Sequence, residues 1–260
     1  MTSGSTYALI TGASKGLGKY FARRLAARKQ NLILVARSKA KLDDFAGELR
    51  DSHGVLVEPL EFDLASPGAG LQLARQLREH DLQTELLVNN AGFGERGKFF
   101  ELSLERQLQM IQLQNTAVVE LTYELLPAMI AAGHGGIINV SSMAGFQPVP
   151  FAAMYSATKS FLTTFSMALR EELRPSGVKV VTVCPGRLRA DPEDASAQEK
   201  RQKVPGREQR HEDVVNETLK KLDSGGGLVI PGRLNRLTVR GQRLMSLNAV
   251  PKIVARLSKS

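Results

Sequence analysis

Tyr155 and Lys159 are the two residues whose types and spacing most directly suggest proton transfer, in the segment YSATK at 155–159. Positions i and i+4 share one face of a helix, so a helix here would place the ammonium beside the phenol. A neighbouring cation lowers the pKa of a tyrosine from about 10, which would allow proton donation or acceptance near neutral pH. The same spacing occurs by chance on exposed helices, so this interpretation depends on the residues around it.

Two polar residues precede this pair in the chain. Ser142 follows an apolar run at 136–140 and stands thirteen positions before Tyr155, and Asn115 lies in a long helical pattern at 103–131. A serine and a tyrosine hydroxyl that converge on one oxygen stabilise the charge that develops there.

A glycine-rich turn, TGASKGLG at 11–18, lies between the first apolar run and a helical pattern. Gly12, Gly16 and Gly18 permit a tight turn, close approach of the backbone to a phosphate, and close packing of helix on strand. The helix start presents N–H groups and a positive dipole end to a pyrophosphate. The position between strand and helix predicts a dinucleotide site, for which glycines alone would be weak evidence.

The residues after the second apolar run favour NADP(H) over NAD(H). Folds that bind NAD place an acidic residue near the end of this strand, where it binds the ribose 2′-hydroxyl. This chain has Ala36 there, while Arg37 and Lys15 could face a 2′-phosphate, and a guanidinium pairs well with phosphate. Two solvated basic residues are the alternative.

Two later strand ends could complete the cofactor site. Asp63 could accept a hydrogen bond from the adenine amino group, or it could simply close a turn. The segment NNAG at 89–92 has small residues and side-chain amides that suit a wall beside the cofactor. Alone, this segment could also be a plain turn.

These residues would be positioned by alternating strands and helices. Short apolar runs rich in Val, Ile and Leu predict buried strands, at 7–10, 31–36, 55–60, 85–88, 136–140, 178–183 and 228–230. Helical patterns lie between them, at 17–29, 39–52, 66–79, 103–131, 152–174 and 211–222. Such alternation predicts an α/β fold with a doubly wound parallel sheet, which binds ligands at the carboxyl ends of its strands.

The composition is that of a globular protein. The chain has 260 residues, of which 42% are hydrophobic and 23% charged, and these values exclude a disordered or collagen-like chain. The single cysteine, Cys184, cannot form an intramolecular disulfide, which fits a reducing compartment. We find neither a signal peptide nor an apolar run of the roughly 18 residues that cross a membrane, so we expect a cytoplasmic protein.

The formal net charge of +9 is concentrated at one end of the chain. Residues 224–260 carry seven basic and no acidic residues, whereas residues 1–223 carry 28 and 26. This distribution, with 5% aromatic residues and no Trp, disfavours nucleic-acid binding. A helix at 233–247 would place Leu234 and Leu237 on one side and several arginines on a neighbouring side. We interpret it first as a solvated face beside the pocket, next as a weak contact with an anionic membrane, and last as a site for a phosphate-bearing acyl thioester.

Over residues 5–232 the sequence resembles the short-chain dehydrogenase/reductase family. The resemblance rests on the order and spacing of TGASKGLG, NNAG, Asn115, Ser142, YSATK and Pro185-Gly186. It implies a single-domain Rossmann fold with a seven-stranded parallel sheet and hydride transfer between a nicotinamide and a carbonyl or alcohol. It also implies a homodimer or homotetramer formed through the helices at 103–131 and 152–174.

The resemblance implies roles for individual residues. Tyr155 would be the proton donor in reduction, Lys159 would lower its pKa and hold the nicotinamide ribose, Ser142 would bind the substrate oxygen, and Asn115 would position a relay water. Ser141 is the neighbouring alternative to Ser142. The residues expected to bind NADP(H) are Gly12, Ser14, Lys15, Gly16, Leu17, Gly18, Arg37, Asp63, Leu64, Asn89, Ala91, Gly92, Tyr155, Lys159, Pro185 and Gly186.

The chain departs from the family pattern in two places. Ala190 stands where the family often has a threonine that binds the nicotinamide carboxamide. The segment 187–210, expected as a lid or loop, has seven basic and five acidic residues instead of a partly apolar sequence. We divide the chain into an oxidoreductase domain at 1–232 and a basic amphipathic extension at 233–260.

The resulting hypothesis is an NADPH-dependent carbonyl reductase or alcohol dehydrogenase acting on a ketone, aldehyde or secondary alcohol. Several apolar and aromatic residues are expected near the mouth of the site, namely Phe93, Phe99, Phe100, Met143, Phe146, Val149 and Phe151. They suggest an apolar or aromatic substrate, and the alternative is that they pack these loops onto the domain. Alternatives are a membrane-associated reductase of 3-oxoacyl or other lipid chains and a catalytically idle NADP-binding sensor. The four histidines have no metal-ligand spacing, are expected at the surface, and predict no metal site.

Overall fold

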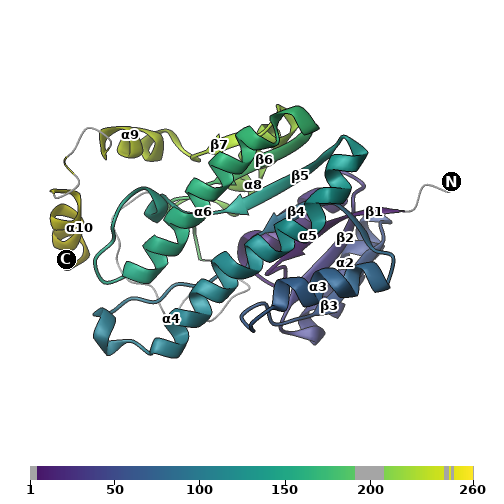
Figure 1. Ribbon diagram of the computed structural model, residues 1–260, viewed down its shortest axis with the longest axis horizontal. Helices are drawn as coiled ribbons and strands as arrows, with labels where there is room; N and C mark the ends of the chain where they lie inside the picture. The colour runs from purple at the N-terminus through teal and green to yellow at the C-terminus, as the bar shows by residue number, and fades with distance from the viewer. Residues whose placement is uncertain (1–4, 191–207, 243–245, 247–248, 260) are drawn as a thin grey trace.

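The computed structural model describes residues 5–190, 208–242, 246 and 249–259. A seven-stranded sheet forms its centre, with every neighbouring pair of strands parallel (Figure 1). The strands are β1 (Thr6–Thr11), β2 (Asn31–Ala36), β3 (Val57–Glu61), β4 (Gln83–Asn89), β5 (Gly135–Val140), β6 (Val178–Val183) and β7 (Gly227–Val229). Their order β3-β2-β1-β4-β5-β6-β7 reverses direction between β1 and β4, where such a fold leaves a crevice for ligands. The predicted doubly wound sheet is confirmed.

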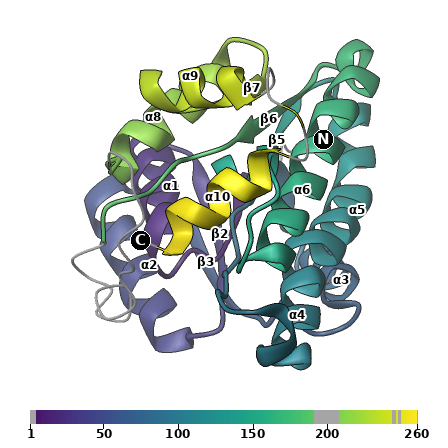
Figure 2. The same cartoon turned by 90° about the vertical axis from the view of Figure 1, so that its left-hand side faces the viewer.

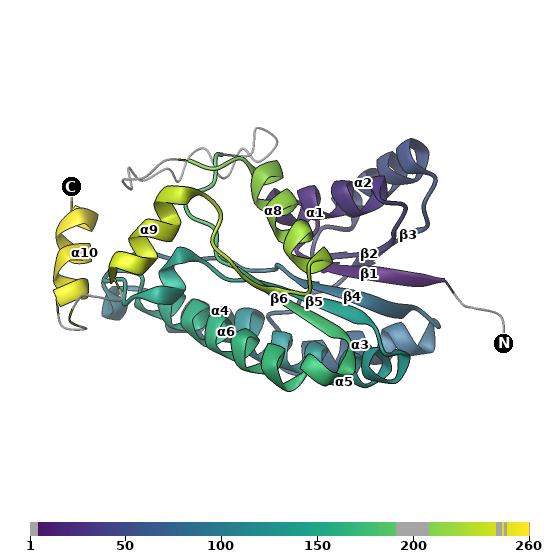
Figure 3. The same cartoon turned by 90° about the horizontal axis from the view of Figure 1, so that it is seen from above.

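Helices cover both faces of the sheet, as Figure 3 shows from above. One face carries α1 (Gly16–Ala27), α2 (Lys39–His53) and α8 (His211–Asp223), and the other carries α3 (Ala69–Glu79), α5 (Ala117–Ala132) and α6 (Ala153–Glu172). Successive strand residues point to opposite faces, so Ile10 packs with the first helices and Leu9 with the second. Both layers are therefore needed to bury one strand, which explains the continuous apolar runs.

The long helix expected at 103–131 is interrupted, which corrects the sequence-based prediction. The structure has α4 (Leu104–Ile111), a π-helical turn at Gln112–Thr116 and then α5. Such wide turns occur mostly as single insertions in α-helices and often at functional sites. This turn holds Asn115, whose side-chain amide Nδ2 donates to the carbonyl oxygen of Thr158 on α6 at 3.0 Å. Short 3-10 turns occur at Phe99–Glu101, Met143–Phe146 and Arg174–Ser176.

Two helices follow the sheet, α9 (Arg233–Gln242) and α10 (Ala249–Lys259), and α10 was not expected. Figure 2 shows α10 passing in front of the carboxyl end of the sheet. The apolar side expected for α9 is turned outward, because Leu234 and Leu237 are 62% and 61% exposed while Val239 is buried. Within the described ranges, no helix has both the length and the apolar character to cross a membrane.

Candidate active site

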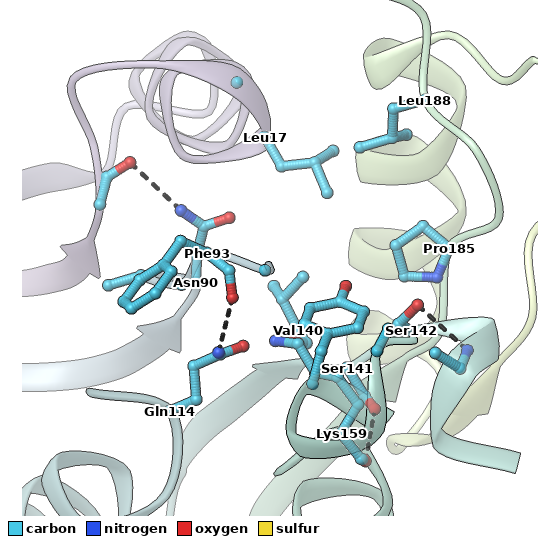
Figure 4. A pocket seen from close by; sticks show the side chains of 18 of the residues that line it. Leu17, Asn90, Phe93, Gln114, Val140, Ser141, Ser142, Lys159, Pro185 and Leu188 are labelled. Atoms are coloured by element: carbon cyan, nitrogen blue, oxygen red, sulfur yellow. Dashed lines mark hydrogen bonds between the residues drawn. The ribbon is translucent and has the colours of Figure 1, made fainter. Parts of the chain in front are cut away.

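A cavity of about 1670 Å³ opens at the carboxyl ends of the strands and extends to α9 and α10. Its walls come from the segments that follow the strands, and from α6. Figure 4 shows Leu17, Phe93, Ser142 and Pro185, from four different segments, around the same space. The cavity brings together most of the predicted site residues, namely Gly12, Ser14, Lys15, Gly16, Leu17, Arg37, Asp63, Leu64, Ala91, Gly92, Ser142, Tyr155, Lys159, Pro185 and Gly186.

The glycine-rich turn is fixed by contacts that a side chain would prevent. Gly12 has a φ of 66°, and a Cβ atom there would lie 2.9 Å from the Cα atom of Ala91. The side-chain amide of Asn90 donates to the carbonyl oxygens of Thr11 and Gly12, at 2.9 and 3.2 Å. Gly16 has a φ of 53° and open space around its missing Cβ. The turn thus leaves open volume at the N-terminus of α1, where a phosphate would meet the positive end of the helix dipole.

Three predicted site residues do not line the cavity, at least among its described residues. Gly18 packs α1 against the turn instead. The side chain of Asn89 is buried and donates to Asn139 at 2.8 Å, whereas its neighbour Asn90 faces the cavity. Asn115 is buried in the π-helical turn. The sequence pattern NNAG therefore marked the right segment, and the structure shows that its second asparagine is the one in the cavity wall.

Gly18→Ala is expected to lower the free energy of unfolding by about 3 kcal/mol. A Cβ atom at Gly18 would lie 2.3 Å from the carbonyl oxygen of Gly12 and 2.6 Å from the amide nitrogen of Asn90, so the turn must move to admit it. Chemical denaturation measures the effect. Gly47→Ala is the control, because nothing lies within 4 Å of that position in α2, and it should stabilise the protein by up to about 1 kcal/mol. Equal effects of the two substitutions would contradict the packing role.

One end of the cavity is cationic. Lys15, Arg37 and Lys41 are exposed and line it together, and Lys41 was not singled out from the sequence. Asp63 also lines this end, where one of its carboxylate oxygens accepts from the backbone N–H of Ala65 at 3.0 Å. That bond agrees with the interpretation that Asp63 closes a turn. The second carboxylate oxygen could still accept a hydrogen bond from the adenine amino group.

Tyr155, Lys159 and Ser142 meet near the middle of the cavity. One turn of α6 separates the first two, and the Lys159 nitrogen lies 5.8 Å from the centre of the Tyr155 ring. Its ammonium donates to the carbonyl oxygen of Val140, at the end of β5, at 2.9 Å. Ser142 follows β5 directly, and its hydroxyl lies close enough to the Tyr155 phenol to lower the pKa of that phenol. Helix α6 and strand β5 therefore bring the predicted hydroxyls and ammonium together.

The pKa values differ from the simple expectation for a Tyr–Lys pair. Burial raises the pKa of Tyr155, and the hydrogen bond from Ser142 offsets this only in part. Burial also lowers the pKa of Lys159 from 10.5 to about 8. The expected lowering of the tyrosine pKa is therefore wrong for this arrangement, because the loss of hydration outweighs the favourable interactions. At neutral pH the phenol stays protonated and the lysine stays mostly charged.

Ser141 and Ser142 face different surroundings, although they are adjacent. The Ser141 hydroxyl bonds within the protein, donating to the carbonyl oxygen of Lys159 at 2.8 Å and lying 2.7 Å from the Thr163 hydroxyl. The Ser142 hydroxyl accepts from the backbone N–H of Ala144 and interacts with Tyr155. Ser141 thus ties β5 to α6, and Ser142 is the hydroxyl beside the phenol, as the spacing to Tyr155 favoured.

The other end of the cavity carries apolar side chains together with polar ones. Of the residues expected at its mouth, Phe93, Met143 and Val149 line it, whereas Phe99 and Phe100 point to solvent with 55% and 81% exposure. The Arg106 guanidinium lies 4.1 Å from the centre of the Phe93 ring and pairs with Glu95 at 3.0 Å. Helix α9 lies beside the pocket, as expected, and supplies Leu234, Asn235, Thr238, Gly241 and Gln242. Sequence reasoning missed α10, which supplies Val250, Ile253 and Val254.

His211 corrects another expectation, because it is not at the surface. It is buried at the start of α8, lines the cavity and stacks on Tyr20 with ring centres 4.7 Å apart. A helical pattern with a single histidine at its first position carries no signal for such a stack, which forms only when α1 and α8 pack together.

The turn after β6 is held from the C-terminal side. The backbone N–H of Gly186 donates to the side-chain oxygen of Gln209 at 2.8 Å, and the side-chain nitrogen of Gln209 donates to Pro231 at 2.7 Å. These bonds fix the Pro185-Gly186 turn against the end of β7. Ala190 ends the described part of this region, and most of the expected lid at 187–210 falls on residues 191–207, outside the described residues.

Comparison with known proteins gives one family. A family model described as short chain dehydrogenase matches residues 6–201. The ketoacyl reductase HetN of Nostoc sp. is 35% identical over 178 residues, 68% of this chain and 62% of that protein. The very-long-chain 3-oxoacyl-CoA reductase of Pyrenophora tritici-repentis is 37% identical over 183 residues, 68% of this chain and 53% of that protein. The match thus spans less than two thirds of either relative.

A solved structure agrees over nearly the whole chain. The short-chain dehydrogenase from Sphingobium yanoikuyae, in complex with NADPH, is 34% identical and superposes with a TM-score of 0.80 over 92% of this chain and 95% of that one. The family model extends across the glycine-rich turn, Ser142 and the Tyr155–Lys159 pair. The chain therefore belongs to the short-chain dehydrogenase/reductase family of NAD(P)-dependent oxidoreductases.

Proposed function

We propose that the chain is an NADP(H)-dependent carbonyl reductase that interconverts an apolar ketone or aldehyde and the corresponding alcohol. The observation that carries this proposal is a single cavity that joins three features. It begins at a glycine-rich turn with a cationic side, passes a Ser–Tyr–Lys cluster, and ends among apolar residues. A dinucleotide site, a proton donor and a substrate pocket are thus arranged in the order that hydride transfer to a carbonyl needs.

The residues present fit a dinucleotide phosphate. The turn at Gly12 and Gly16 would hold the pyrophosphate at the N-terminus of α1, because space is open where Gly16 lacks a Cβ. Arg37 and Lys41, with Lys15, would hold the 2′-phosphate. Asp63, Leu64 and the strand ends carrying Ala91, Gly92, Pro185 and Gly186 would complete the walls. When bound, the reduced nicotinamide supplies the hydride.

The chain's own residues would control the proton. Tyr155 is protonated at neutral pH, because the ordinary pKa of a phenol is about 10 and burial raises it further, so its hydroxyl can donate to a carbonyl oxygen. The hydroxyl of Ser142 would hold the same oxygen and stabilise the charge that develops there. The ammonium of Lys159 would stabilise the phenolate left after proton transfer. Asn115 stays a proposed positioning residue, because its amide bonds the backbone of α6 beside Lys159.

The apolar end of the cavity and the names of the relatives also support a narrower candidate, a reductase of 3-oxoacyl chains. Pocket residues such as Val149, Val250 and Val254 would contact an acyl tail, and each buried methylene adds about 0.8 kcal/mol to binding. A lid at 187–210 and a homodimer or homotetramer remain proposals by resemblance. A cytoplasmic location remains a proposal from the sequence, which has a single cysteine and no signal peptide pattern. A catalytically idle sensor is the alternative, although the complete Ser–Tyr–Lys cluster argues against it.

We expect kcat/KM for 3-oxoacyl thioesters to rise about fourfold with each added methylene until the tail fills the cavity. The measurement is initial-rate NADPH consumption with a series of chain lengths, alongside compact ketones. A rise that stops at short chains while bulky ketones are turned over would favour the broader carbonyl reductase. Tight NADPH binding without turnover of any substrate would favour the sensor.

A further inference from the structure

The helices α9 and α10 expose apolar side chains next to the mouth of the cavity. Leu234 and Leu237 on α9 are 62% and 61% exposed, and Ile253 on α10 is 41% exposed. Leu234 and Ile253 also line the cavity, so these exposed side chains stand at its rim. In Figures 1 and 2 the two helices form one end of the molecule, outside the carboxyl edge of the sheet.

Basic side chains lie on the same exposed arc of α9 as its leucines. At about 100° per residue, Arg233, Leu234, Leu237 and Arg240 fall within an arc of about 120° on α9, opposite the buried Val239. Both arginines are exposed, as is Lys252 on α10. Arg236 lies at the edge of this arc and pairs with Glu217 of α8 at 3.4 Å. Helices bind at the surface of anionic membranes through the apolar area that they bury together with the electrostatic attraction of their basic residues.

We propose that this surface, named the rim face and formed by Arg233, Leu234, Leu237, Arg240, Lys252 and Ile253, docks the protein on an anionic lipid bilayer with the cavity mouth toward the lipid. A lipophilic carbonyl substrate would then enter the apolar end of the cavity from the membrane, without crossing water. The identity of that substrate rests on the proposed reductase function, but the docking itself does not.

Charge and composition favour lipid over other occupants. A second copy of the chain in a two-fold interface would bring the same basic residues together, because such an interface is self-complementary, and residues 224–260 contain no acidic residue to neutralise them. Neither α9 nor α10 contains an aromatic residue on which a nucleic-acid base could stack. An anionic bilayer can interact with both kinds of residue on the rim face. Its headgroups would pair with the basic side chains, and the leucine side chains would be buried at the boundary of its acyl chains.

The test is flotation of the full-length protein with vesicles of phosphatidylcholine alone or mixed with phosphatidylglycerol. We expect binding to the mixed vesicles at about 0.05 M salt, with the partition coefficient falling roughly tenfold at about 0.5 M salt. Each basic residue near the surface contributes about fivefold, so Arg233→Gln with Arg240→Gln should lower the coefficient about 25-fold. Leu237→Ser should lower it roughly tenfold, because its side chain would no longer enter the lipid.

The control variants remove the same kinds of side chain, two arginines or one leucine, from other parts of the surface. Arg24→Gln with Arg75→Gln removes the same charge from exposed positions on α1 and α3, and Leu71→Ser removes an exposed leucine from α3; both should bind as the unsubstituted protein does. The proposal is overturned if mixed vesicles are not bound at low salt, or if the controls lose as much binding.

Two further results would assign the rim face to another occupant and also overturn the proposal. The first is a change of oligomeric state in Leu237→Ser without vesicle binding, and the second is tighter binding of an oligonucleotide than of mixed vesicles. Reduction of a water-soluble ketone without lipid is measured separately. It shows whether the proposed enzymatic function stands when docking fails.

Discussion

Tyr155→Phe is expected to lower kcat for carbonyl reduction about 10³-fold, the contribution of a positioned general acid. Phenylalanine retains the ring, which packs on the loop at Gly94, where a Cβ atom would lie 3.0 Å from the tyrosine ring. It removes only the hydroxyl that Ser142 contacts. The affinity for NADPH, followed by titration of the cofactor's fluorescence, should stay within a factor of about three because the cationic end of the cavity is unchanged.

A pair of serine variants serves as the matched control. Ser142→Ala should lower kcat about 100-fold, because it removes the hydroxyl beside the phenol. Ser141→Ala should leave kcat near that of the unsubstituted protein and reduce stability instead, because that hydroxyl bonds Lys159 and Thr163 inside the fold. Full activity in Tyr155→Phe would refute the assignment of the proton donor, and a larger rate loss in Ser141→Ala would exchange the roles of the serines.

Arg37→Ala is expected to lower the affinity for NADPH about 30-fold and to leave the affinity for NADH within about twofold. A hydrogen bond to a charged group contributes about 1.5–3 kcal/mol, and Arg37 lines the cavity at the end of β2, where Ala36 provides no carboxylate. Lys15 and Lys41 line the same end and would retain part of the attraction. Equilibrium titration with both cofactors measures the effect.

Lys39→Ala is the control for this substitution. Lys39 stands two positions from Arg37, is exposed and pairs with Asp43 at 3.2 Å, but it is not among the described residues that line the cavity. The loss of one positive charge near the site should therefore change NADPH affinity by about twofold or less. Equal losses for NADPH and NADH in Arg37→Ala would overturn the proposed contact with a 2′-phosphate.

The sheet and the middle of the site follow from local sequence patterns. Each strand buries both faces under helices, so its apolar run is continuous and easy to recognise. Tyr155 and Lys159 lie one helical turn apart, which makes their shared face predictable from spacing alone. The position of Ser142 in the site is also predictable, because Ser142 stands at the end of a strand and the ends of parallel strands meet at one edge of the sheet.

Other features depend on contacts between distant segments, which spacing does not encode. The π-helical turn at Gln112–Thr116 packs on α6, where Asn115 bonds the backbone at Thr158. Asn90 replaces Asn89 in the cavity wall because the first asparagine bonds Asn139 across the sheet. The raised pKa of Tyr155 results from its loss of hydration in the cavity wall, which depends on the whole fold.

The central claim is hydride transfer from NADPH to a carbonyl carbon, and deuterium transfer tests it most directly. The purified protein would be incubated with NADPH deuterated at the transferring position and with 3-oxoacyl thioesters or ketones, and the alcohols analysed by mass spectrometry. We predict one deuterium on the new carbinol carbon with the unsubstituted protein and almost no product with Tyr155→Phe. Alcohol without the label, or no alcohol from any carbonyl despite tight NADPH binding, would contradict the account.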